Sequence, residues 1–204
     1  METWGLEGLH PNFIVGIGGS AGALNAYKAL LEPLPSNTGM AFIIVAHIHP
    51  TADRQLVQIL SRHTKMPVTL ASTEIPIRAN HVYVIPSHPD LLIESYTFKV
   101  VSPRTMRNVQ IDLVFRSLAE AMGARAIGIV LSGYDAEGTE GCIHIKAKGG
   151  TTFAQDMSAE VKGMPLSAQA SGCVDFVLSP DQMPDELQRL VSKPQRTTDL
   201  TPGS

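Results

Sequence analysis

The sequence has few cysteines and no marked excess of charge of either sign. Of its 204 residues only two are Cys, and 16 Lys and Arg stand against 19 Asp and Glu. Cys142 and Cys173 are far apart and outside any CxxC spacing, which argues against a disulfide framework and a thiolate metal site. The charge balance gives no reason to expect binding to nucleic acid or to anionic membranes. Because the two cysteines give no sign of a disulfide framework, we expect a protein of the reducing cytoplasm.

Long apolar runs are also missing. No stretch approaches the roughly 20 apolar residues that a membrane span needs, and residues 1–12 lack the basic start and apolar core of a signal peptide. A chain of this length suits one domain with a sizeable core. We expect that domain over residues 13–192, flanked by flexible segments at 1–12 and 193–204 that contain too few apolar residues to pack.

Between these ends, short apolar runs alternate with segments of helical period. A strand over residues 13–17, a helix over 21–31 and a strand over 40–46 form the first βαβ unit. Apolar residues at i, i+3, i+4, i+7 and i+11 predict a helix over 111–122, and the nearly all-apolar run at 126–131 is typical of a strand covered on both faces. Further strands are expected at 68–71, 82–85, 151–154 and 174–178, with a hairpin from 91–94 and 98–101. The pattern predicts a three-layer, doubly wound α/β domain with a mostly parallel sheet and a small hairpin excursion.

Polar residues follow three of these strands directly. Ser20 lies between glycines at a strand-to-helix turn, where free helix N–H groups are available to an oxyanion. His47 follows the strand at 40–46, and Asp135 and Glu137 follow the strand at 126–131. Because the carboxyl ends of neighbouring parallel strands lie close together, these residues are candidates for a Ser-His-acid triad.

Each residue taken alone has a simpler interpretation. Ser is a preferred N-cap residue, so Ser20 is equally well explained as the start of a helix. A lone histidine such as His47 is more often a buried polar residue than a catalytic base. Asp135 and Glu137 lie at a helix start, where the helix dipole favours carboxylates whatever their role. These alternatives stay open for the individual positions.

Two other functions and one other fold compete with the interpretation of an acyl-transfer site. Residues 16–21 match the GxGxxA dinucleotide fingerprint, but the second strand ends in His47 and not in the acidic residue that binds the ribose. His47 and His49 have the HxH spacing of metal ligands without a recognisable third ligand. Gly18-x-Ser20-x-Gly22 matches the elbow of α/β-hydrolases, whose triad order is serine, acid, histidine. Here the order is serine, histidine, acid, which disfavours that fold.

Four motifs in the same order resemble one known family. VGIGGSAGAL (15–24), IIVAHIHP (43–50), IGIVLSGYDAEGTEG (127–141) and AQD…GMP (154–165) are similar to the catalytic domain of the chemotaxis protein-glutamate methylesterases, CheB, over about residues 13–190. The resemblance implies a serine hydrolase that acts on glutamyl methyl esters of chemoreceptor cytoplasmic helices and releases methanol. It also implies deamidation of receptor glutamines, no cofactor and no metal.

The resemblance places the nucleophile at Ser20 and the general base at His47, and it leaves His49 outside the triad. The backbone N–H groups of Ala21 and Tyr134 are expected to hold the oxyanion. Where the family has an aspartate this chain has Glu137, so we expect Glu137 as the triad acid and keep Asp135 as the alternative.

The resemblance also implies binding partners, but the residues that would contact them are less clearly indicated by the sequence. The methylated receptor region is an acidic helical bundle, and Arg54, Arg104 and Arg107 flank the segments expected at the rim of the cleft, although arginines on a surface are more often merely solvated. The family's regulatory version carries a receiver domain that this chain has no room for, so a receiver or methyltransferase partner in a longer protein is a further expectation. The competing function is an interaction domain of the same fold in which the altered acid motif has weakened catalysis.

Overall fold

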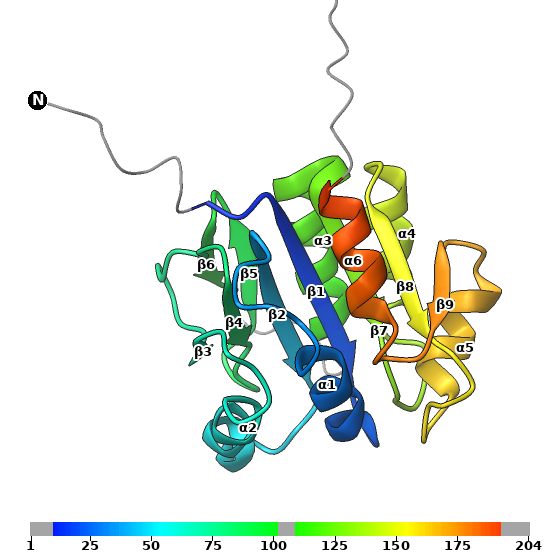
Figure 1. The fold of residues 1–204 in the computed structure, drawn as a ribbon, viewed down its shortest axis with the longest axis horizontal. Coiled ribbons are helices and arrows are strands. Elements are labelled where there is room, and N and C mark those ends of the chain that lie inside the picture. The colour runs from blue at the N-terminus through cyan, green and yellow to red at the C-terminus, as the bar shows by residue number, and fades with distance from the viewer. Residues whose placement is uncertain (1–9, 102–108, 193–204) are drawn as a thin grey trace, which may run out of the picture.

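The central element is a parallel sheet of seven strands, seen in a computed structural model that describes residues 10–101 and 109–192. The strand order is β3-β4-β2-β1-β7-β8-β9, and β5 and β6 form a separate antiparallel hairpin (Figure 1). The strands are β1 (Phe13–Gly19), β2 (Met40–Ala46), β3 (Val68–Leu70), β4 (His81–Val84), β5 (Leu91–Glu94), β6 (Thr97–Val100), β7 (Ala126–Val130), β8 (Thr151–Gln155) and β9 (Phe176–Leu178).

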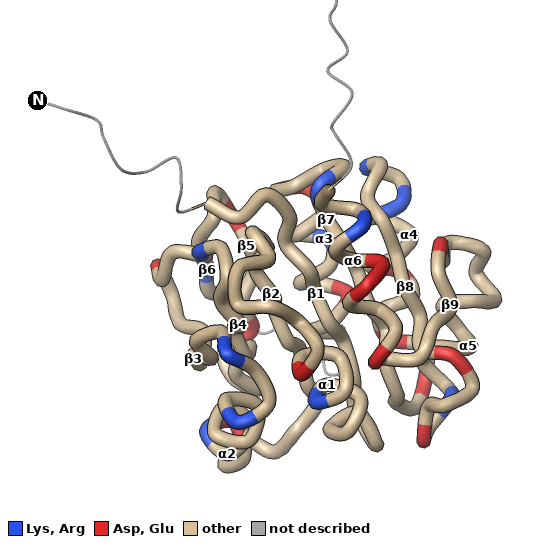
Figure 2. The backbone as a smooth tube through the Cα atoms, in the orientation of Figure 1, with Lys and Arg blue, Asp and Glu red and all other residues tan. Residues whose placement is uncertain are grey.

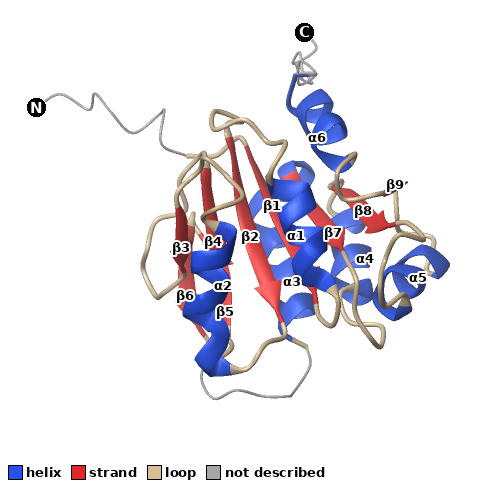
Figure 3. Ribbon diagram, turned by 60° about the horizontal axis from the view of Figure 1, so that its bottom comes forward, coloured by secondary structure: helices blue, strands red, loops and turns tan. Residues whose placement is uncertain are grey.

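Helices cover both faces of this sheet, which confirms the predicted three-layer α/β architecture (Figure 3). The helices α1, α2 and α6 pack on one face, and α3, α4 and α5 pack on the other. Their bounds are α1 (Ala23–Leu31), α2 (Asp53–Leu60), α3 (Gln110–Met122), α4 (Thr139–Ala147), α5 (Gly163–Ala170) and α6 (Met183–Ser192), with short 3-10 turns η1 (Pro50–Ala52) and η2 (Gly123–Arg125).

The middle of the sheet is buried on both sides. Every residue of β2 and of β7 is buried, as is all of β1 after Phe13. This burial explains why the sequences of these strands are continuous apolar runs and do not alternate between apolar and polar residues. Each buried Ile, Leu or Val side chain contributes roughly 1.5–3 kcal/mol, so these strands form a rigid base for the loops that follow them.

Two glycines of β1 allow α3 to approach the sheet closely. A Cβ atom on Gly18 would lie 2.5 Å from Ile111 of α3, and one on Gly16 would lie 2.9 Å from Phe115. The glycines of the GxGxxA motif are therefore accounted for by helix packing. The close approach also brings the N-terminus of α3 to the carboxyl end of β1.

Several boundaries differ from the predicted ones. The first helix begins at Ala23 and not at Ala21, and α5 was not predicted. Residues 10–12 belong to the packed part of the chain: the N–H of Asn12 donates to the Gly39 carbonyl at 3.0 Å, and the ring of His10 lies 4.4 Å from that of Tyr96.

No helix in residues 10–101 and 109–192 combines the length and apolar character required to cross a bilayer. Along the backbone in Figure 2, positions of Lys and Arg are interspersed with positions of Asp and Glu. This mixture is what the near-neutral charge balance of the sequence leads one to expect.

Candidate active site

The register of the sheet brings the three predicted loops together. Gly19 of β1 is paired with Ala46 of β2, and Gly18 is paired with Val130 of β7. Hydrogen bonds continue this pairing beyond the strands, because the Ser20 N–H donates to the Ser132 carbonyl at 2.9 Å and the His47 N–H donates to the Gly19 carbonyl at 3.2 Å. Ser20 and His47 therefore emerge from adjacent strands at the same edge.

Ser20 does not cap the helix that follows it. The N-cap of α1 is Gly22, whose φ of 74° lies in the left-handed region that glycine tolerates best. The Ser20 carbonyl accepts from the Ala23 N–H at 3.1 Å, but its hydroxyl forms no hydrogen bond with any residue in the described ranges. The half-exposed hydroxyl is thus free to face a substrate, which weakens the N-cap interpretation.

His47 contacts a carboxylate from the third loop. Its Nε2 atom lies 2.9 Å from Oε2 of Glu137, and the two side chains are 25% and 5% exposed. The distance is that of a hydrogen bond, but the alignment of the N–H with the oxygen is poor. Nε2 lies beside Glu137, so Nδ1 is the ring nitrogen that does not contact this carboxylate.

The other oxygen of Glu137 is fixed by the start of α3. Oε1 accepts from the backbone N–H of Ile111 at 2.7 Å, and the residue is 7% exposed. Ile111 belongs to the first turn of α3, where free N–H groups and the helix dipole favour a negative charge. The extra methylene of glutamate relative to aspartate is therefore accommodated by a carboxylate held between α3 and His47.

Asp135 has a different environment. It is exposed, its φ is 63°, and it makes no hydrogen bond or ion pair with the described residues. Of the two acids left open by the sequence, Glu137 is the one in contact with His47.

A cavity of about 560 Å³ connects these side chains, and its lining is strongly acidic. The lining residues are Ser20, His47, Asp112, Tyr134, Asp135, Ala136, Glu137 and Glu140. Burial raises the pKa of Asp112, and the charge of Glu137 adds to this effect, while backbone N–H groups of Gly141 and Gly138 oppose it. The cavity thus combines a hydroxyl, an imidazole and four carboxylates.

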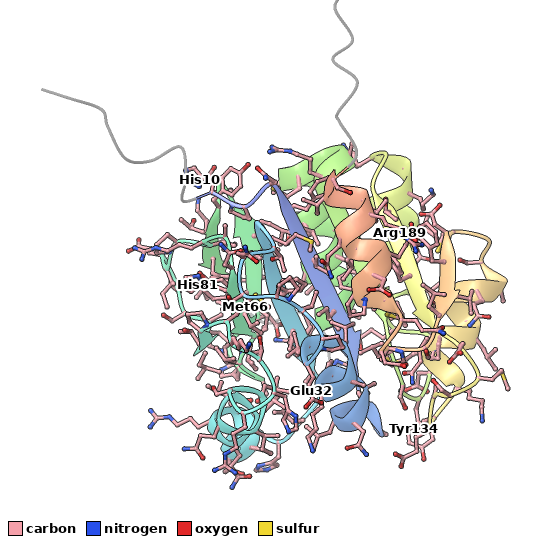
Figure 4. The ribbon with its side chains drawn as sticks, viewed as in Figure 1. His10, Glu32, Met66, His81, Tyr134 and Arg189 are labelled. Carbon is pink, nitrogen blue, oxygen red and sulfur yellow. The ribbon has the colours of Figure 1, made fainter. Side chains whose placement is uncertain are left out.

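Two backbone N–H groups beside Ser20 are available to an oxyanion. Neither Ala21 N–H nor Tyr134 N–H donates a hydrogen bond to another residue in the part of the chain that the structure describes. Figure 4 shows Tyr134 at the edge of the molecule toward which β1 runs, and 65% of this residue is exposed. Tyr134 can therefore contribute through its backbone without its side chain being packed.

Sequence reasoning missed the residues that hold these turns in place. The Ser132 hydroxyl donates to the Ala21 carbonyl at 2.7 Å and accepts from the Val161 N–H at 2.9 Å. The Ser132 N–H donates to Oε1 of Gln155 at 2.9 Å. Both residues stand at or just beyond strand ends within quoted motifs, which was the one available indication. Together they fix the Ala21 peptide relative to the loop after β7.

The remaining predicted site residues lie elsewhere. Arg54 is exposed on α2 and does not line the acidic cavity, and Arg104 and Arg107 lie outside the described residues. Nδ1 of the exposed His49 lies 2.9 Å from the Thr51 hydroxyl and accepts from the Thr51 N–H at 3.4 Å. His49 therefore caps η1 and has different partners from His47.

The two cysteines, distant in sequence, meet in the core away from this cavity. Both are buried, and they form no disulfide. A hydrogen bond from the Cys142 thiol lowers the pKa of Cys173 to about 6, and the same contact together with burial raises the pKa of Cys142. Neither residue lines the acidic cavity.

Comparison with known proteins gives the family. The family model described as CheB methylesterase matches residues 15–187. The chain belongs to the CheB methylesterase family. A relative from Leptospira interrogans is 33% identical over 178 residues, which are 85% of this chain and 92% of the relative. The CheB assignment made from four motifs is thereby confirmed.

Two further CheB relatives define the extent of the match. The protein-glutamate methylesterase/protein-glutamine glutaminase of Hydrogenovibrio crunogenus is 30% identical over 187 residues, and the match covers 88% of this chain but only 50% of that protein. The crystal structure of the Thermotoga maritima CheB methylesterase catalytic domain superposes with a TM-score of 0.83 at 26% identity, covering 87% of this chain and 98% of that domain. The chain therefore has the fold of a CheB catalytic domain.

Proposed function

We propose that this protein is a serine hydrolase that cleaves glutamyl methyl esters of chemoreceptor cytoplasmic helices and releases methanol. The observation that carries the proposal is the 2.9 Å contact between His47 and Glu137 in the cavity that Ser20 lines. The names of the CheB relatives support the choice of substrate and of a second reaction, deamidation of glutamine.

In the proposed reaction His47 accepts the Ser20 hydroxyl proton as the oxygen attacks the ester carbonyl. Glu137 orients the imidazole and stabilises its positive charge, while the α3 N-terminus holds the carboxylate. The N–H groups of Ala21 and Tyr134 receive the negative charge on the carbonyl oxygen, a contribution worth about 10² to 10³ in kcat for each donor in comparable enzymes.

The second half of the proposed reaction reverses these roles. His47 gives its proton to the departing methanol, which leaves a glutamyl ester on Ser20. A water molecule then gives a proton to His47 and attacks the acyl group, and Ser20 leaves with that proton. The product glutamate is negatively charged, and the carboxylates of Asp112, Asp135 and Glu140 repel it. The neutral ester meets no such repulsion, so the acidic cavity favours product release.

The experiment that tests this function is methanol release from membranes that carry methylated chemoreceptors. We expect Ser20→Ala to lower the rate at least about 10⁴-fold, because the nucleophile is lost. Ser36→Ala, an exposed serine in the loop before β2, is the matched control and should retain the full rate.

Two results would contradict the proposal. Equal methanol release by the wild type and Ser20→Ala would exclude Ser20 as the nucleophile. Binding of the wild type to receptor membranes without any methanol release would favour an interaction domain of the same fold.

A further inference from the structure

A second cavity reaches Ser20 from the other face of the sheet. It has a volume of about 200 Å³ and lies between α1 and α2. Its lining residues are Ser20, Gly22, Leu24, Tyr27, Ala46, Ile48, Ala52, Gln55, Leu56 and Ile59. Ser20 is the residue that this lining shares with the acidic cavity.

Strand geometry explains why the two cavities lie on opposite faces. Successive side chains of an extended segment point to opposite sides, so Ala46 and Ile48 face away from His47. Ala46 packs in the core under α1 and α2, with Ile48 against it, whereas the acidic cavity is lined by Asp112 of α3 and Glu140 of α4. Ser20 stands at the end of the sheet, between the two.

The second cavity has no charged side chain in its lining. Leu24 is 38% exposed although it is a large apolar residue, and Ile48 and Ile59 are half-buried. Burial raises the pKa of Tyr27 far above its usual range, so its phenol stays neutral. This apolar surface adjoins the nucleophile and stabilises a bound group through the hydrophobic effect.

The position of the imidazole decides which part of an ester this cavity receives. His47 must protonate the departing oxygen, so the alcohol has to leave on the side of the acidic cavity. The acyl group bonded to Ser20 then extends toward the other face. In a glutamyl ester the acyl group begins with two side-chain methylenes, which are apolar.

We propose that the cavity between α1 and α2 is an acyl-binding subsite, and that it gives the protein a further activity on small esters of unbranched aliphatic acids. A volume of 200 Å³, at about 30 Å³ for each water-sized group, holds about six non-hydrogen atoms. Butyryl and hexanoyl chains match this size. The inference rests on the proposed function of Ser20.

The reaction on such an ester balances without any co-reactant except water. Ser20 Oγ forms a bond to the acyl carbon and transfers its proton to His47, and the bond to the alcohol oxygen breaks. With p-nitrophenyl esters the leaving group departs as p-nitrophenolate. Water then hydrolyses the acyl-enzyme, releases the fatty acid and restores the serine.

The test uses p-nitrophenyl acetate, butyrate and hexanoate with the full chain. We expect kcat/KM to rise from acetate to hexanoate by at least tenfold, since one fully buried methylene is worth up to about fourfold. Gln55→Trp places a larger side chain in the lining of the cavity and should abolish this rise, so that acetate, butyrate and hexanoate are hydrolysed with similar kcat/KM. Gln58→Trp is the matched control, because Gln58 is also an exposed glutamine on α2 but does not line the cavity.

The outcomes separate the subsite from the proposed function. Hydrolysis that depends on Ser20 but shows the same kcat/KM for every chain length would overturn the subsite and leave the nucleophile intact. A rise with chain length that persists in Gln55→Trp would also overturn it. If no ester is hydrolysed in a Ser20-dependent manner, the small-ester activity is excluded, and methanol release from receptors tests the proposed function independently.

Discussion

The two cavities that meet at Ser20 have opposite chemical character. The one on the α3 and α4 face is lined by an imidazole and four carboxylates, and the one on the α1 and α2 face has no charged lining residue. Both include residues from the loops that follow β1 and β2. The difference shows that, at the end of a parallel sheet, strand alternation alone can separate a charged cavity from an uncharged, largely apolar one.

The largest expected difference between the two cavities is the loss of rate when the carboxylate of Glu137 in the acidic cavity is removed. Glu137→Gln should lower the rate of methanol release about 10³- to 10⁴-fold, because the amide no longer stabilises a charged imidazole. The substitution keeps an oxygen that accepts from the Ile111 N–H, so we expect the fold to be retained.

Asp135→Asn is the matched variant for this prediction. It alters the exposed carboxylate on the same loop, two residues earlier, and should change the rate less than about threefold. A large loss in Asp135→Asn together with full activity in Glu137→Gln would show that the wrong acid was chosen.

A smaller expected effect is that of Asp112, also in the acidic cavity, on the free energy of unfolding. The pKa of Asp112 is raised by burial and by the charge of Glu137, so the folded state binds this proton more tightly than the unfolded state does. The free energy of unfolding therefore falls as pH rises through and above the ordinary value of 3.8. Asp112→Asn removes this cost and keeps an acceptor for the Gly141 N–H.

Thermal unfolding of Asp112→Asn at several pH values checks this prediction. We expect Tm to rise at pH 7 by at most about 2–4 °C, the shift that 1 kcal/mol produces in a domain of this size. The gain should vanish at pH values below 3.8, where the group is protonated in both states. A lower Tm at pH 7 would contradict the account, and Asp135→Asn serves as the control without a buried charge.

The sequence predicts best those elements whose structure depends on a single local pattern, such as a continuous apolar run. Both bounds of the strand over residues 40–46 were predicted correctly, because every position in it is apolar and buried. The sequence also indicated that Ser20 and His47 follow neighbouring strands, and the pairing of β1 with β2 places them at the same edge of the sheet; their catalytic roles stay a prediction. α5 was missed because Gly163 and Pro165 in its first turn suggest a break, and this helix is stabilised mainly by packing.

The finer features of the site depend on contacts between distant segments. Spacing could not choose between Asp135 and Glu137, because the choice depends on the Ile111 N–H, which comes from a helix 26 residues away. In a helix over residues 21–31, spacing alone predicts that Leu24 shares a buried face with Tyr27 and Leu31. The structure leaves Leu24 exposed, where it lines the apolar cavity. Neither feature has a local sequence pattern.

The most direct test of the triad is the rate at which a fluorophosphonate probe labels this protein, with the modified residue located by peptide mass spectrometry. The account predicts that wild-type protein is labelled at Ser20 and that His47→Ala slows labelling by about 10²-fold or more, because the hydroxyl loses its general base. Labelling at another residue, or an equal rate in His47→Ala, would contradict it.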